Sequence, residues 1–533
     1  MNRHFGRLAA AGGLLAALSV AEAAYAQKQG GVLKIYFFDS PASVSIHEET
    51  TAAGQGPVMG VFNNLVMYKQ DVPQSGMQSI VPDLASEWSW DEDKTQLTFR
   101  LREGVKWHDG KPFTAKDVKC TWDLLAGKSS EKLRINPRKA WYRNLEEVAA
   151  NGDLRGHLSP EAAAAGLYRA CSPPAFRRSI RATFRRATCV SIRSAPARSN
   201  SSSSSQTSRS RSRRNLDYWK KGQPYLDGIE YQIIKNVSTG VLAFVSGKVD
   251  MTSPYFLQVP VVKDVKNQSP AGDLRAGPGK RQSQRDDEPR GTPFQQRRSA
   301  AGGGAQPRSQ GLCRHPDPGQ GRCRRGHAAA AGRRVGMPPE MLKTLPGYDP
   351  DVPKNRAEGR RIMEQLGYRP DKRLEIKVST RNLAPYRDAA ILLIDQLKEI
   401  YIDAELEPVD TVQWFPKVMR GDYTVGLNLT GNGVDDPDQT LYENFTCGAE
   451  GNYDRYCNPE VDKMVDRQSM EFDQKKRKEL VWAIERKLAE DAARPILWHN
   501  RTGTCWQPYV KGYTPMVNSV YNGWRFEDVW LDR

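Results

Sequence analysis

Two groups of side chains in this sequence are of types that could do chemistry. His108 lies next to Asp109, and a histidine beside a carboxylate is a common arrangement for general acid–base catalysis. Four further residues are possible metal ligands, namely Cys313, His315, Cys323 and His327. Their spacing matches no pattern of a zinc site, so we expect no metal there.

The chain alternates between strand and helix patterns, which predicts an α/β fold. Residues 31–36 have the pattern of a strand, and residues 228–236 alternate like another. Residues 374–406 predict a strand–helix–strand unit, with apolar helix positions at 391, 393, 394, 397 and 400. Residues 459–490 predict a pair of charged, amphipathic helices.

The 533-residue chain is long enough for two or three lobes, and it begins with a typical secretory signal. Within residues 1–26, Arg3 and Arg7 precede an apolar stretch, and Ala24-Tyr25-Ala26 forms an A-x-A cleavage site. We therefore expect the mature protein to begin near Gln27. No cysteine lies near that junction, which favours a periplasmic protein without a lipid anchor. That compartment allows disulfides.

Two segments depart from the pattern of the rest. Residues 154–214 hold 13 Arg, no Lys and one acidic residue, and residues 272–334 hold 14 basic residues against five acidic ones. These segments carry net charges of +12 and +9, so the remainder of the +17 chain sums to −4. Residues 191–214 could be interpreted as a disordered RNA-binding tail, but they contain no aromatic side chain on which a base could stack.

One stretch, residues 81–118, resembles a known family. It contains the strings VPDLASEW, LTFRLR, GVKWHDG and FTAKDV, and a second landmark, NLDYWKKG, follows at residues 215–222. In this order the strings resemble the family 5 extracytoplasmic solute-binding proteins of ABC importers, the oligopeptide- and dipeptide-binding group. The resemblance also implies a helix at residues 60–66.

This resemblance implies a two-lobed periplasmic-binding-protein fold of type II, similar to cluster C, with a hinge and a ligand cleft between the lobes. We expect the first lobe to take residues 27–268 and 497–533, and the second to take residues 272–496. The family's members work with an ABC permease and ATPase at the inner membrane. A monomer without a cofactor is the corresponding expectation.

The resemblance also suggests why the two arginine-rich segments look foreign. A GC-rich gene that is read out of frame yields Arg, Ala, Gly, Pro and Ser in excess. With permitted codons, another frame of residues 177–212 contains HPIGTGPFKF, which the family carries just before the landmark at residues 215–222. Another frame of residues 272–334 contains NNADLRRAVALNLDRKAF, which resembles the family's signature helix. We interpret both segments as frameshifted, by gene decay or sequencing error, and expect irregular excursions there.

One loop is the expected ligand site. Residues 429–438, LTGNGVDDPD, resemble the segment in which an aspartate of peptide-binding members pairs with the α-amino group of the peptide. Gly433 stands at the position of that aspartate. Either Asp435 replaces it, or the ligand has no free amine, or Asp435 is a solvated loop carboxylate. We favour Asp435 as the ligand residue, with Asp436 as the fallback and Asn432 beside them.

The resemblance bears on two other pairs of residues. Cys447 and Cys457 bracket a short loop that resembles a disulfide loop of dipeptide-binding members. The string that holds His108 and Asp109 lies at a strand-to-turn junction in the family, with Gly110 in the turn. We therefore favour a structural role for this pair over acid–base catalysis.

The function that these observations favour is capture of a peptide or peptide-like solute in the periplasm. An enzyme is the main rival, but the segments of ordinary composition contain no nucleophile elbow, zincin helix, phosphate loop or dinucleotide motif. Nucleic-acid binding would rest only on the arginine-rich segments. A decayed copy, or a protein for an opine, a sugar or a metal chelate, is the remaining alternative.

Overall fold

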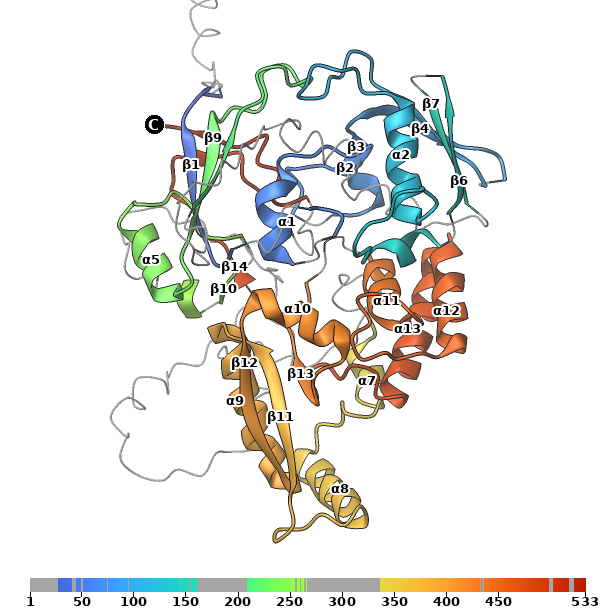
Figure 1. Ribbon diagram of the computed structural model, residues 1–533, viewed down its shortest axis with the longest axis vertical. Coiled ribbons are helices and arrows are strands. Elements are labelled where there is room, and N and C mark those ends of the chain that lie inside the picture. Colours follow the sequence, from blue (N-terminus) through green and yellow to red (C-terminus); the bar gives the residue numbers. More distant parts are fainter. Residues whose placement is uncertain are drawn as a thin grey trace, which may run out of the picture.

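The computed structural model describes residues 27–40, 45–48, 51–73, 75–93, 95–143, 145–152, 155–160, 209–254, 256–258, 260–262, 265, 336–431, 433, 436–497, 502–516 and 522–533. The expected signal peptide and the cysteine–histidine cluster lie outside these residues. Among the described helices, none has the length and apolarity needed to span a bilayer. We call the elements up to β10, together with β14–β16, the first lobe, and the elements from α7 to α13 the second lobe (Figure 1).

A three-stranded sheet with the order β1-β9-β8 forms the centre of the first lobe. Strand β1 (Val32–Phe37) pairs in parallel with β9 (Gly228–Ile233), as the sequence predicts, and β8 (Arg209–Arg213) pairs antiparallel with β9. Helix α5 (Val237–Val245) follows β9 and packs on β1. It comes so close that a Cβ on Gly240 would lie 2.3 Å from the ring of Tyr36.

An antiparallel sheet with the order β4-β5-β7-β6 forms a second part of this lobe. Its strands are β4 (Ala85–Trp90), β5 (Leu97–Leu101), β6 (Leu145–Asn151) and β7 (Arg155–Pro160). Helix α2 (Ala115–Ala126) packs against β6 and β7, and buries Trp122 in the core. Thr114 and Asp117 form a capping box that begins this helix.

The helix that the resemblance implies at residues 60–66 is wrong. Helix α1 (Ala52–Met59) lies earlier, and the hairpin of β2 (Val66–Tyr68) and β3 (Ile80–Pro82) follows; the short η1 (Met77–Ser79) leads into β3. Helix α1 stops at Gly60, where a Cβ would lie 3.0 Å from the carbonyl oxygen of Arg525. The chain therefore turns away under the C-terminal segment.

The second lobe is built on a parallel sheet with the order β12-β11-β13. Its strands are β11 (Leu374–Arg381), β12 (Ile402–Val409) and β13 (Val425–Leu427). Helix α9 (Ala384–Leu397) and η5 (Lys398–Ile400) connect β11 to β12, which confirms the predicted strand–helix–strand unit. Around the sheet lie α7 (Pro339–Leu342), α8 (Val352–Gln365) and α10 (Thr411–Arg420).

Three helices complete the second lobe and reach the first (Figure 1). They are α11 (Pro437–Phe445), α12 (Pro459–Met470) and α13 (Gln474–Glu490), so the predicted helix pair at 459–490 is confirmed. Their shared core includes Leu441, Val461 and Ile484, all with no exposed surface. Helix α11 also contacts η2 (Lys139–Tyr142) of the first lobe.

The C-terminal segment returns to the first lobe (Figure 1). Strand β10 (Leu257–Gln258) pairs with β14 (Thr502–Gly503), and β15 (Val510–Lys511) pairs with β16 (Trp530–Leu531). Trp506 and Trp524 join the hydrophobic core around β1. The first lobe is therefore closed by residues from both ends of the mature chain.

The expectation of irregular excursions is wrong at both ends of segment 154–214. Residues 155–160 form β7 and residues 209–213 form β8, while residues 161–208 lie outside the described part. Strand pairing uses main-chain groups, so a strand position can be filled by an atypical sequence. In β8, the arginines at 209 and 211 lie 3.4 and 2.7 Å from Glu230 of the neighbouring strand.

Candidate functional site

The two parallel sheets meet at the carboxyl ends of their strands. Asp39 follows the end of β1, and Arg381 is the last residue of β11; the Nη2 atom of Arg381 donates to Oδ2 of Asp39 across 3.2 Å. Ligands of α/β proteins bind at the carboxyl ends of parallel strands. This junction between the lobes is therefore the natural place for a ligand.

Arg381 is held by further groups of the second lobe. Its guanidinium donates to the hydroxyl of Tyr386 at 2.8 Å and to Oγ1 of Thr411, at the start of α10, at 3.0 Å. Its Cζ also lies 4.9 Å from the centre of the Tyr386 ring. Burial raises the pKa of Tyr386, so its phenol stays protonated near neutral pH. Sequence reasoning overlooked this cluster, because nothing in the sequence pairs residues 39 and 381.

The predicted ligand loop leaves the same edge of the second sheet. It follows β13, whose Leu427 carbonyl accepts a hydrogen bond of 2.8 Å from Oγ1 of Thr380 on β11. Farther along, the amide of Gly433 donates to Oε1 of Gln439 on α11, at 2.7 Å. The side chains of Asn432 and Asp435 lie outside the described residues. The described parts place both ends of the loop beside the junction of the sheets.

The fallback residue Asp436 is committed to structure. It is 4% exposed and begins α11, where its Oδ1 accepts from the amide of Asp438 at 3.0 Å. Both of its oxygens also accept from the guanidinium of Arg477 on α13, at 3.0 and 2.9 Å. Such a paired arrangement fixes both partners in direction. Arg477 thus ties the end of the ligand loop to the helices behind it.

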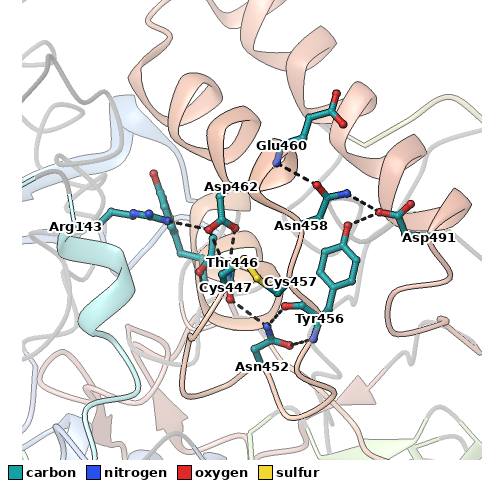
Figure 2. The surroundings of a disulfide bond; sticks show 11 residues. Arg143, Thr446, Cys447, Asn452, Tyr456, Cys457, Asn458, Glu460, Asp462 and Asp491 are labelled. Carbon is teal, nitrogen blue, oxygen red and sulfur yellow. Dashed lines mark hydrogen bonds and ion pairs between the residues drawn. A yellow bond between two sulfur atoms is a disulfide. The ribbon is translucent and has the colours of Figure 1, made fainter.

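A disulfide joins Cys447 and Cys457, whose Cα atoms are 4.5 Å apart. Figure 2 shows that Asn452 lies inside the closed loop, where its side chain donates to the carbonyls of Thr446 and Tyr456 at 3.0 and 2.6 Å. The loop is anchored outside as well, because the hydroxyl of Tyr456 donates to Asp491 beyond the end of α13. These contacts order the segment between α11 and α12.

His108 and Asp109 lie in a turn before α2. The amide of Gly110 donates to the carbonyl of Trp107 at 2.9 Å, and Gly110 has a φ of +84°, which favours glycine. Asp109 accepts from the amide of Lys111 at 3.1 Å. Burial lowers the pKa of His108 to about 3, so its imidazole is neutral near pH 7. This geometry is that of a structural turn.

The landmark strings of the sequence converge on one buried charge network. Asp83, with no exposed surface, lies 3.3 Å from Lys220 and 3.0 Å from Arg525. Glu527 accepts from Lys220 at 2.7 Å and from the hydroxyl of Tyr218 at 2.6 Å. Although burial raises it, the two cations hold the pKa of Glu527 well below its ordinary value. The strings therefore maintain the first lobe.

Within the described residues, no group of three or more histidine, cysteine, aspartate and glutamate side chains could hold a metal ion.

The chain was compared with known families, curated proteins and solved structures. A family model described as bacterial extracellular solute-binding proteins, family 5 matches residues 79–168 and 327–452. The unmatched stretch between them, residues 169–326, contains most of both arginine-rich segments.

Curated relatives match over short stretches. The periplasmic alpha-galactoside-binding protein of Rhizobium meliloti is 51% identical over 43 residues, which cover 8% of this chain and 6% of that protein. A putative ABC transporter peptide-binding protein of Brucella ovis is 43% identical over 63 residues, 12% of this chain and 11% of that one. The dipeptide-binding protein of Escherichia coli is 35% identical over 77 residues, 14% of each. The matched stretches thus span a small part of these relatives.

Solved structures match over nearly the whole chain. Haemophilus influenzae OppA, in complex with the peptide RPPGFSPFR, has a TM-score of 0.72 at 17% identity and covers 95% of this chain and 100% of its own. Helicobacter pylori DppA, in complex with the peptide STSA, has a TM-score of 0.69 at 15% identity and covers 95% and 99%. These likenesses show the two-lobed fold of periplasmic binding proteins.

Proposed function

Because the chain belongs to family 5 of the bacterial extracellular solute-binding proteins, we propose that it captures a peptide or peptide-like solute and delivers it to a membrane permease. The family match on both sides of the arginine-rich segments carries this proposal. The permease would belong to an ABC importer with its ATPase, and the binding protein would act as a periplasmic monomer after removal of residues 1–26. In this role it is a carrier and performs no catalysis.

The proposed ligand lies between the lobes, beside the junction of Asp39 and Arg381. The peptide's α-amino group carries a positive charge, and an unpaired charge in a closed cleft is costly. Asp435 would supply the matching carboxylate, while Gly433 and Asn432 would line the same loop. The commitment of Asp436 to Arg477 supports Asp435 over the fallback, since both oxygens of Asp436 already have partners.

Replacing Asp435 by Asn tests this assignment. We expect D435N to weaken binding of a free-amine peptide by roughly 2 to 5 kcal/mol, the range for removing one partner of a buried charge pair. Titration calorimetry with a peptide and its N-acetylated form measures the effect. The acetylated peptide should lose affinity for the unaltered protein but show little further loss in D435N.

Glu375 provides a matched control, because it is an exposed carboxylate on β11 of the same lobe. E375Q should bind the peptide like the unaltered protein. If D435N kept full affinity, the amine would be bound elsewhere or would be absent from the ligand.

A further inference from the structure

Asp39 and Arg381 form an ion pair between the two lobes that is shielded from water. The two residues are 3% and 5% exposed, and their charged groups approach to 3.2 Å. They are 342 positions apart in the chain and follow or end the central strands of two different sheets. The contact therefore exists only while the lobes are together.

The pair is built into its surroundings on both sides. On the first lobe, Oδ1 of Asp39 accepts from the amide of Ser40 at 2.9 Å. On the second lobe, Tyr386 and Thr411 hold the guanidinium from the opposite side. Two charges buried in this way stabilise a contact only when each has its partner, since one alone would lose its hydration without compensation.

We propose that Asp39 is a positioning residue that holds the lobes together through Arg381 before any ligand arrives. The ligand-free protein then populates a closed arrangement. This proposal deepens the proposed function and rests on it for the effect on ligand affinity, whereas the closed arrangement itself can be tested without a ligand. A protein that is already closed for part of the time loses less affinity to the cost of closing.

Small-angle X-ray scattering of the ligand-free protein tests the proposal. The mature full-length chain and D39N are measured, in the written sequence and with both frames restored. We expect D39N to have a larger radius of gyration than the unaltered protein, because the lobes separate when Arg381 loses its partner. The closing equilibrium should shift on the order of a hundredfold.

Asp403 supplies the matched control. It pairs with Arg373 at 2.9 Å inside the second lobe, where the two side chains are 50% and 25% exposed. D403N makes the same carboxylate-to-amide change without touching the contact between lobes, and it should leave the radius of gyration unchanged. Equal radii for D39N and the unaltered protein, or an unaltered protein that is already open, would overturn the proposal.

A second measurement covers the case in which D39N fails to fold. Hydrogen–deuterium exchange on the unaltered, ligand-free protein should show slow exchange at residues 38–40 and 381–386. Fast exchange at both segments would contradict a closed arrangement. Peptide binding then separates this proposal from the proposed function. With RPPGFSPFR as the probe, D39N should bind more weakly than the unaltered protein; tighter binding would mean that Asp39 competes with the ligand for Arg381. No binding by any variant, with compaction intact, would refute the peptide assignment alone.

Discussion

Asp436 and Arg477 show how a single residue changes the interpretation of a loop. In the sequence, Asp435 and Asp436 are equivalent candidates for a ligand amine. In the structure, Asp436 is paired with Arg477 through both oxygens, and Arg477 also lies 3.0 Å from Asp438. Two of the three neighbouring carboxylates are thus neutralised inside the lobe. The sequence contains no local signal for this pair, because its members are 41 positions apart.

Glu443 on α11 gives a prediction on pH. Burial raises its pKa from 4.5 to about 7, although Arg138 and Gln439 act in the opposite direction. Between those pH values the folded state binds a proton that the unfolded state does not. This group therefore stabilises the folded protein fully below about pH 4.5, and the contribution is lost as the pH rises through about 7.

Replacing Glu443 by Gln should remove that dependence, since glutamine does not titrate. We expect the melting temperature of the unaltered protein to fall more than that of E443Q between pH 5.5 and pH 8, measured by circular dichroism. The difference between the two proteins isolates this side chain from other titrating groups. Parallel pH curves for both proteins would show that Glu443 titrates normally.

At the scale of elements, the sequence predicts what depends on neighbours in the chain. The strand–helix–strand unit at 374–406 is correct, because its strands and helix carry their own apolar periodicity. Helix α1 was missed because Gly54, Gly56 and Pro57 are poor helix residues. Its stability comes from tertiary packing: a Cβ on Gly56 would lie 2.6 Å from the ring of Trp524, which a local pattern cannot reveal.

The loop between α11 and α12 carries the prediction for an element. We expect the Cys447–Cys457 bridge to be present in protein isolated from the periplasm, because the compartment is oxidising and the structure joins the two residues. Closing so short a loop should contribute about 2 to 3 kcal/mol to the free energy of unfolding. Peptide mapping without reductant checks the bridge, and urea unfolding of the C447S/C457S double variant checks its contribution. Two reactive thiols in native protein would refute the prediction.

At the scale of the molecule, the two arginine-rich segments are the main departure from the family. The family match resumes at residue 327, close to the end of the second segment, and stops at residue 168, early in the first. We interpret this as two frameshifts in an otherwise ordinary member. The interpretation also accounts for the charge, because the rest of the chain sums to −4.

Restoring both frames should therefore stabilise the protein. The missing strands and the signature helix would add buried apolar surface to both lobes, against a typical domain stability of about 5 to 15 kcal/mol. We expect a cooperative thermal melt for the restored chain and a broad or absent transition for the written one, followed by circular dichroism. Resequencing of the gene is the companion measurement. An intact reading frame, together with a cooperative melt of the written chain, would contradict the interpretation.

The central claim is that the protein binds a peptide-like amine between its lobes, and a calorimetric ligand panel tests it most directly. The frame-restored mature protein is titrated with the free-amine peptide STSA, with N-acetylated STSA and with an alpha-galactoside, the ligand class named for the Rhizobium meliloti relative. We predict saturable binding of one free-amine peptide per protein and no heat of binding for the other two. Binding of the alpha-galactoside with no response to the peptide would contradict the account.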